Sequence, residues 1–190
     1  SALDVATGRI RGTATVGVEP EGIAISPDGR RIYVACEGDS HVYAIDATTL
    51  QVVKKLRMLA RPRTILFSRD GSRAFVTNEI GVALTVVDVG TDSIVRTISL
   101  SSPANPQLRP MGVVESIDGK LLYVTTGRGS SLLEIDLAAG RVSRSIEKVG
   151  QRPWGLAISG DGRRAYTANG PGGDVSVVDL ASGKVLRRIP

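Results

Sequence analysis

One pattern of residues occurs four times along this 190-residue chain, and it limits the possible folds more than any other feature. Each copy contains a short apolar run, a tight turn that ends in Asp-Gly, a second apolar run that begins near Tyr or Phe, and a third apolar run that ends in Asp. The turns occupy residues 26–29, 68–71, 116–119 and 159–162, so their glycines are 42, 48 and 43 residues apart.

This repeat length is typical of the blades of a β-propeller, in which about 40–45 residues form one four-stranded sheet. The apolar runs are short and are bounded by Gly, Asp and Pro, which favours strands and turns over helices. The aspartate that ends the third run occurs five times, at positions 4, 46, 88, 136 and 179. The sequence therefore predicts an all-β chain, a β-propeller of four-stranded antiparallel blades with about four and a half blades present.

The repeat divides the chain into a half-blade and four blades. We expect the half-blade at 1–17 and the blades at 18–59, 60–100, 101–150 and 151–190. The third blade is longer because eight residues, 101–108, are inserted before its first strand. The chain contains five third strands but only four first and second strands, which indicates part of a longer propeller. Blade faces left open in such a part could drive self-association.

Composition narrows the classes of function. The net charge is +5, but the basic residues are dispersed through turns and outer strands, which is typical of a solvated surface and not of a nucleic-acid site. The single cysteine, Cys36, excludes an internal disulfide. No apolar run approaches the length of about 18 residues that a membrane helix requires, and no signal peptide is visible in a chain that begins at Ser1.

The repeated elements resemble the YVTN family of β-propeller repeats over essentially the whole chain. The second strands carry the resemblance, and they read YVAC, FVTN, YVTT and YTAN. The family implies a propeller, commonly of seven blades, in exported bacterial or archaeal proteins, and hence a periplasmic or extracellular location. The segments 61–63, 149–154 and 174–179 and the insertion also resemble propellers associated with PQQ-dependent alcohol catabolism. That narrower resemblance implies a periplasmic quinoprotein dehydrogenase or cytochrome as partner.

Arginines precede the inner strands of three blades, where the links should meet at the mouth of the propeller channel. The candidates for binding a partner or ligand are Arg61, Arg63, Arg109 and Arg152. Guanidinium groups suit carboxylates, phosphates or acidic protein surfaces, although they could equally join neighbouring blades. Trp154, the only tryptophan, is either a binding anchor at the same rim or a packing residue between blades.

The loops between second and third strands offer weak candidates for a metal site. Glu37, Asp39 and Glu79 could supply oxygens to Ca²⁺, as in some propeller lactonases, or could be solvated loop residues. His41 is the only histidine, so a multi-histidine zinc or copper site is excluded, and His41 remains a candidate for ligand contact. We expect no cofactor in this chain. The aspartates that end the third strands are interpreted as structural, because they can accept N–H groups of the following turn.

These observations favour a non-catalytic exported propeller that binds a partner protein or a small ligand on its loop face, with no nucleic acid and no membrane span. A metal-assisted hydrolase or lactonase with its site in the channel is the second hypothesis. A cell-surface or surface-layer adhesion module is the third. No nucleophile elbow, phosphate loop, dinucleotide fingerprint or zinc motif favours an enzyme.

Overall fold

The computed structural model describes all 190 residues, and it is built almost entirely from strands. Four antiparallel sheets of four strands and one two-stranded sheet follow one another along the chain, which confirms the predicted fold class.

We name the four-stranded sheets blade 1 to blade 4, and the half-blade holds β1 (Ala2–Leu3) and β2 (Ile10–Gly12). Blade 1 contains β3 (Pro20–Ile25), β4 (Arg31–Cys36), β5 (His41–Asp46) and β6 (Val52–Arg57). Blade 2 contains β7 (Pro62–Phe67), β8 (Arg73–Asn78), β9 (Ala83–Asp88) and β10 (Ser93–Ser99). Blade 3 contains β11 (Val113–Glu115), β12 (Leu121–Thr125), β13 (Leu132–Asp136) and β14 (Arg141–Ile146). Blade 4 contains β15 (Pro153–Ile158), β16 (Arg164–Asn169), β17 (Asp174–Asp179) and β18 (Lys184–Ile189).

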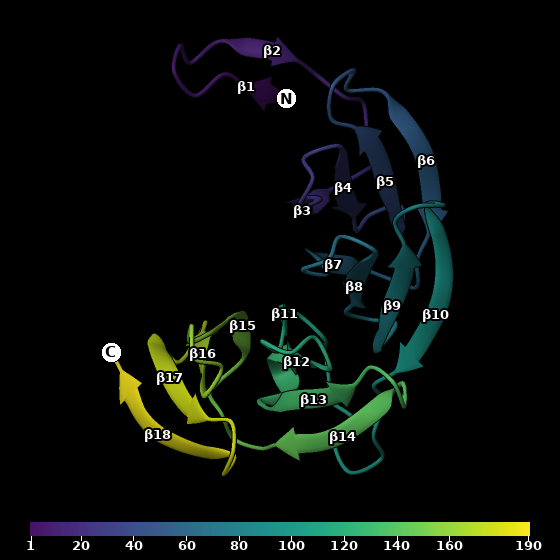
Figure 1. Ribbon diagram of the computed structural model, residues 1–190. Helices are drawn as coiled ribbons and strands as arrows, with labels where there is room; N and C mark the ends of the chain where they lie inside the picture. Colours follow the sequence, from purple (N-terminus) through teal and green to yellow (C-terminus); the bar gives the residue numbers. More distant parts are fainter.

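The blades are arranged side by side around an arc, with the two termini towards its two ends (Figure 1). The first strand of each blade lies towards the centre of the arc and the fourth strand lies on its outside (Figure 1). Strands within each sheet are paired in sequence order. The loops that join second to third strands and the links that join one blade to the next therefore lie on the same side of the arc. No helix in the chain has the length and apolar character required to cross a bilayer.

Local hydrogen bonds explain why the turns recur. In blade 1, the hydroxyl of Ser26 donates to Asp28 Oδ1 (2.6 Å), and the same oxygen accepts the N–H of Arg30 (3.0 Å). Gly29 adopts φ 72°, a left-handed conformation in which a side chain would be strained. The other three copies repeat both hydrogen bonds, so one short motif closes every hairpin between first and second strands.

The aspartates that end the third strands are structural, as predicted. Asp46 Oδ1 accepts hydrogen bonds from the N–H (2.8 Å) and the hydroxyl (3.0 Å) of Thr49. Equivalent bonds to the following turn occur at positions 4, 88, 136 and 179. Because each carboxylate is used to hold its own turn, these residues do not form a functional ring.

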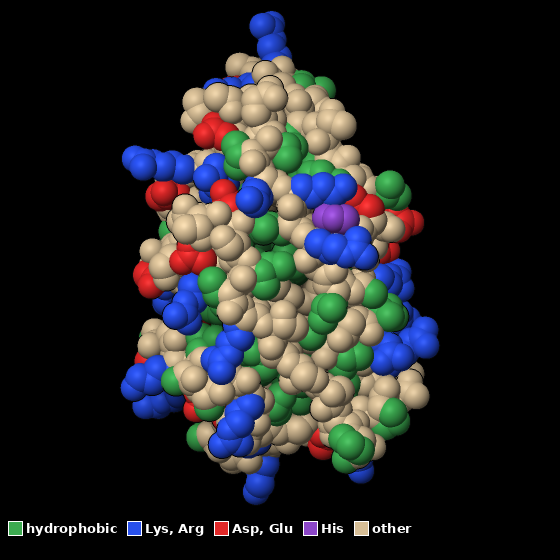
Figure 2. Space-filling model, turned by 90° about the vertical axis from the view of Figure 1, so that its right-hand side faces the viewer, with side chains coloured by type: hydrophobic (Ala, Val, Ile, Leu, Met, Phe, Trp, Pro, Cys, Tyr) green, Lys and Arg blue, Asp and Glu red, His purple; other side chains and the backbone are tan.

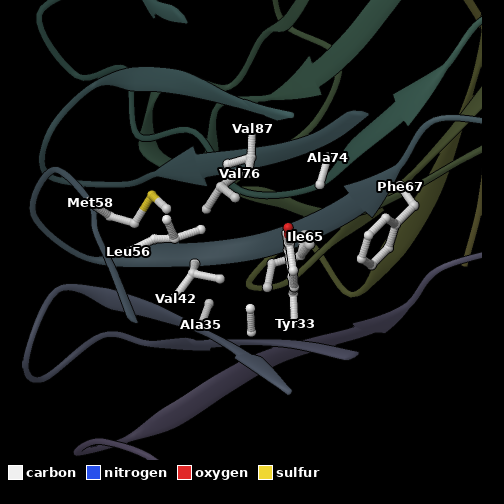
Figure 3. Close-up of a cluster of buried hydrophobic side chains, with 11 residues drawn as sticks. Tyr33, Ala35, Val42, Leu56, Met58, Ile65, Phe67, Ala74, Val76 and Val87 are labelled. Carbon is white, nitrogen blue, oxygen red and sulfur yellow. The ribbon is translucent and has the colours of Figure 1, made fainter. Parts of the chain in front are cut away.

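The hydrophobic core lies between blades. Side chains alternate along each strand, so one face of a blade packs against the preceding blade and the other against the following one. Between blades 1 and 2, Tyr33, Leu56 and Met58 face Ile65 and Phe67 (Figure 3). The rings of Tyr33 and Phe67 are 4.9 Å apart between centroids. Each such side chain, once buried, contributes about 1.5–3 kcal/mol, so neighbouring blades stabilise each other.

The inserted segment 101–108 is held in place by a hydrogen bond from Asn105 and by the burial of Leu108. Leu108 is almost completely buried, with 2% of its surface exposed, and Leu100 lies in the core between blades 2 and 3. The amide group of Asn105 donates to the carbonyl of Gly129 (3.0 Å). That carbonyl belongs to a short 3-10 turn, η1 (Gly127–Gly129), which the sequence reading did not predict.

Candidate functional site

Arg63 is the centre of an ion-pair network at the start of the inner strand β7. Its Nη1 lies 2.7 Å from Glu21 and 2.9 Å from Glu37, and its Nε donates to Glu79 (2.7 Å). Arg63, Glu37 and Glu79 are largely buried, with side-chain exposures of 15%, 11% and 10%. One guanidinium thus joins carboxylates from blade 1 and blade 2.

Arg61 extends the same network towards solvent. Its Nη2 and Nε both donate to Glu37 (3.0 and 3.3 Å), and its Nη1 lies 3.8 Å from Glu79. The hydrogen bond from Arg61, followed by the charge of Arg63, lowers the pKa of Glu37 below its ordinary value. We call the five residues Glu21, Glu37, Arg61, Arg63 and Glu79 the Arg63 network.

Backbone geometry places these side chains at the links between blades. Glu19, Arg61 and Arg152 adopt positive φ angles of 55°, 58° and 54°, each directly before a proline. The left-handed conformation turns each carbonyl towards the loop that follows the second strand. The carbonyl of Glu19 accepts the N–H of Glu37 (3.0 Å), and the carbonyl of Arg61 accepts that of Glu79 (2.8 Å). The links and the second-to-third-strand loops are therefore tied together in a fixed arrangement.

The predicted metal candidates have other partners. Glu37 and Glu79 each contact both Arg61 and Arg63. The arginines therefore occupy the carboxylate oxygens that a metal ion would have to coordinate. Asp39 lies apart from them, where its Oδ2 accepts the hydroxyl of Tyr43 (2.7 Å) and lies 3.5 Å from Lys55 Nζ. The structure does not bring these three carboxylates together as one ligand set.

His41 begins β5, opposite Arg57 at the end of β6, and lies beside Asp39. Its Nδ1 is 2.5 Å from the carbonyl oxygen of Asp39 and 3.7 Å from the Asp39 carboxylate. Figure 2 shows this single histidine between basic side chains on the outer side of the molecule. Elsewhere on this face, Lys and Arg are interspersed with acidic and neutral residues and form no continuous basic stripe (Figure 2).

Three arginines at the links and loops of blades 3 and 4 form no salt bridge, unlike Arg61 and Arg63 of blade 2. The salt bridges of blades 3 and 4 belong to Arg144 on β14 and Arg188 on β18. Arg109 donates to the carbonyls of Leu108 (2.7 Å) and Pro106 (3.5 Å), both in its own link. Arg152 stacks over the ring of Trp154, with 4.8 Å between the guanidinium carbon and the ring centroid. Arg128 lies exposed on η1, which packs against the backbone of Arg109.

Trp154 is 45% exposed and lies on the face of blade 4 that points away from blade 3, where no further blade of this chain covers it. It borders an open cleft of about 480 Å³ on the far face of blade 4, together with Ala168 and Val175. Its backbone does join blades, because its carbonyl accepts the hydroxyl of Thr125 (3.0 Å). The side chain and the backbone of this residue thus have separate roles.

The arginines at the links and loops consequently differ in their pairing. Arg61 and Arg63 in blade 2 are paired with glutamates, whereas Arg109, Arg128 and Arg152 in blades 3 and 4 form no salt bridge. We call these three arginines with Trp154 the basic rim.

The sequence analysis identified most of these residues but missed the role of Glu21. Glu21 and Arg63 occupy the same position in consecutive repeats, and opposite charges at one repeat position are the signal that could have identified the pair.

Comparison with known proteins agrees with this architecture. The family model described as "Lactonase, 7-bladed beta-propeller" matches residues 23–184. A curated relative, the seven-bladed beta-propeller protein Rv1057 of Mycobacterium tuberculosis, is 31% identical over 129 residues, which are 64% of this chain and 30% of the relative. The match therefore spans less than a third of that protein.

Two solved structures share the fold. A chain of Kuenenia stuttgartiensis hydrazine synthase matches with a TM-score of 0.79 and 26% identity, over 96% of this chain and 52% of its own. Dihydro-heme d1 dehydrogenase NirN, in complex with DHE, matches with a TM-score of 0.78 and 23% identity, over 99% of this chain and 41% of its own. The repeat, the blades and the match across most of the sequence lead to one conclusion: the chain belongs to the lactonase family of seven-bladed β-propellers.

Proposed function

We propose that this chain is part of a non-catalytic, exported propeller that binds an acidic partner at its basic rim. The observation that carries the proposal is the unequal pairing of the arginines. Arg61 and Arg63 are neutralised by glutamates, whereas Arg109, Arg128 and Arg152 have no carboxylate partner. Unpaired arginines on a fixed scaffold remain available to a ligand.

The chemistry of the rim favours a protein surface rich in carboxylates. Guanidinium groups bind carboxylates through two parallel hydrogen bonds, and exposed arginines accelerate the association of oppositely charged surfaces. Trp154 adds a flat apolar contact beside Arg152, and Trp and Arg are the residues most often found as interface hot spots. The rigid links limit the entropy that binding would cost.

The location and the partner follow from the finer resemblances. We propose that the repeats are of the YVTN type, that the protein is periplasmic or extracellular, and that a quinoprotein dehydrogenase or cytochrome supplies the acidic surface. The resemblance to propellers of PQQ-dependent catabolism supports this assignment.

The second candidate function is a lactonase, which the description of the matching family favours. A metal-assisted site in the channel would use carboxylates such as Glu37 and Glu79, but both are paired with arginine here. An assay of lactone hydrolysis, with and without added Ca²⁺, distinguishes the two functions. We expect no acceleration over buffer and no shift of the melting temperature with Ca²⁺. A saturable rate that disappears in Glu79→Gln would replace the binding proposal.

Trp154 makes the binding proposal directly measurable, because it is the only tryptophan and belongs to the rim. A synthetic oligoglutamate peptide serves as the acidic probe, and its binding is followed by the change in tryptophan fluorescence. We expect saturable binding that weakens as salt increases, since exposed charges are screened. An oligolysine peptide of equal length should produce no change.

Charge-reversal variants locate the binding surface. Arg109→Glu combined with Arg128→Glu should abolish the response, while both residues lie outside the core and the fold is retained. The matched control is Arg30→Glu combined with Arg163→Glu. It reverses the same number of charges, on turns at the opposite side of the blades. If the control weakens binding as much as the rim variant, the response reflects net charge and the proposal is wrong.

A further inference from the structure

The inserted link 101–108 does more than lengthen the connection between blades 2 and 3. It borders a groove of about 550 Å³ against the blade-2-facing side of blade 3. This volume is within the range of about 300–1,000 Å³ that small-molecule sites occupy. The groove is separate from the basic rim, since its lining contains none of the rim residues.

The floor of the groove is aliphatic. Leu100, Leu108 and Leu133 line it and are each no more than 2% exposed, and Val142 on β14 is half-buried beside them. Leu100, Leu133 and Val142 belong to or pack against the core between blades 2 and 3, so this part of the floor is preformed. Such a surface binds a short hydrocarbon chain by removing it from water, at about 0.8 kcal/mol for each buried methylene.

The edge of the groove carries a single charge. Glu147 is exposed at the end of β14 and forms no salt bridge. The hydroxyl of Ser145 donates to its Oε1 (2.5 Å), which orients the carboxylate and leaves Oε2 without a protein donor. The remaining polar lining residues are serines and Asn105, so no Lys or Arg lines the groove in a chain that has 24 of them.

The insertion keeps this arrangement open. Asn105 is anchored to the carbonyl of Gly129, and Leu108 is inserted into the core, so the link is fixed at both points instead of collapsing onto blade 3. The link between blades 1 and 2 has no counterpart of residues 101–108. Five of the ten residues that line the groove belong to this insertion, so the insertion forms one wall of the groove.

We propose that this groove is a binding site for a small aliphatic amine. Its ammonium group pairs with Glu147 and its hydrocarbon chain lies on the leucine floor. The charge selects a cation over an alcohol or a carboxylate of equal length, and the absence of aromatic side chains argues against a stacked sugar or an aromatic ring.

Amide NMR of the full chain tests the proposal, with pentylamine as the probe and with pentanol and pentanoate as neutral and anionic analogues. We expect saturable shifts of amide signals within 99–108 and 142–148, weaker shifts with pentanol, and none with pentanoate. Glu147→Gln should raise the half-saturating concentration of pentylamine by about threefold or more, the effect of losing a partly exposed ion pair. Glu19→Gln, an exposed glutamate that also lacks a salt bridge, is the matched control and should leave it unchanged.

Several results would overturn the assignment. Shifts of equal size with pentanol and pentylamine, or an unchanged affinity in Glu147→Gln, would show that the carboxylate does not select the ligand. Absence of saturation, or shifts that cluster at the basic rim or the open blade faces, would show that the groove is not the site. Thermal unfolding of each variant establishes that it is folded, because Glu147 and Glu19 are both exposed.

Discussion

Replacing Arg63 should destabilise the propeller more than replacing any exposed arginine. Arg63→Met keeps part of the aliphatic stem but removes the charge that lies 2.7–2.9 Å from three glutamates. Loss of one partner of a buried ion pair typically costs about 3–5 kcal/mol, because the other charge is left uncompensated. Arg61 still contacts Glu37 and Glu79, so we expect a smaller loss of about 2–3 kcal/mol.

Urea unfolding measures this loss, and thermal unfolding should show a fall of about 5–10 °C in Tm for a chain of this size. The control is Arg30→Met, since Arg30 is 88% exposed and lies 4.0 Å from its partner Asp28. We expect the control to change stability by no more than about 0.5 kcal/mol. A double-mutant cycle with Glu79→Gln separates the direct ion pair from general effects of each substitution.

The pH dependence provides a second test of the same reasoning. Arg61, then Arg63, lowers the pKa of Glu37 from its ordinary value of 4.5, so the pairing stabilises the fold above that value and is lost as the pH falls through the lower folded-state pKa. The difference between wild type and Arg63→Met should therefore be largest near neutral pH and should shrink below about pH 4.5. A difference that is constant from neutral pH to pH 3, or no larger than that of the control, would refute the ion-pair explanation.

Three further predictions concern the scaffold. Thr125→Ala should cost about 0.5–1.5 kcal/mol in urea unfolding, because the Trp154 carbonyl loses the hydroxyl of Thr125 but keeps the N–H of Gly112 as a donor, and Thr125→Ser should recover part of the loss. Hydrogen bonds, the first from Ser68, lower the pKa of Asp70 to about 2, so its stabilising effect is present above its ordinary pKa and is lost as the pH falls towards 2. Ser68→Ala should therefore raise the Asp70 pKa towards 3.8 in a side-chain NMR titration, and an unchanged pKa would contradict this. Gly22→Ala should destabilise by about 3 kcal/mol, since its new Cβ would lie 2.0 Å from a backbone oxygen of blade 2, and an unchanged Tm would show that the strands can separate without cost.

The strands and turns could be predicted because the interactions that form them are local. The bond from Ser26 to Asp28 spans two residues, and the bond from Thr49 to Asp46 spans three, so the motif contains its own partners. The alternation of apolar residues then decides which side chains face a neighbouring blade. The architecture of a blade can therefore be predicted from the repeated sequence alone.

The sequence could not predict which arginines of the candidate site form ion pairs. Arg61 and Arg109 occupy equivalent repeat positions, yet one is neutralised by Glu37 and the other contacts only its own link. The sequence predicted an arc of equivalent arginines, whereas the structure separates a paired group from an unpaired one. The exposure of Trp154 and its stacking with Arg152 were likewise invisible in the repeat.

The repeat, the blade, its turns and the faces that become buried can all be predicted from the amino-acid sequence, because each depends on residues a few positions apart. Tertiary structure decided which charges are neutralised and where a groove opens. Arg63 reaches Glu79 across 16 residues and Glu21 across 42, and Asn105 reaches Gly129 across 24. Such contacts exist only after the blades pack side by side, since packing brings equivalent positions of successive repeats within hydrogen-bonding distance.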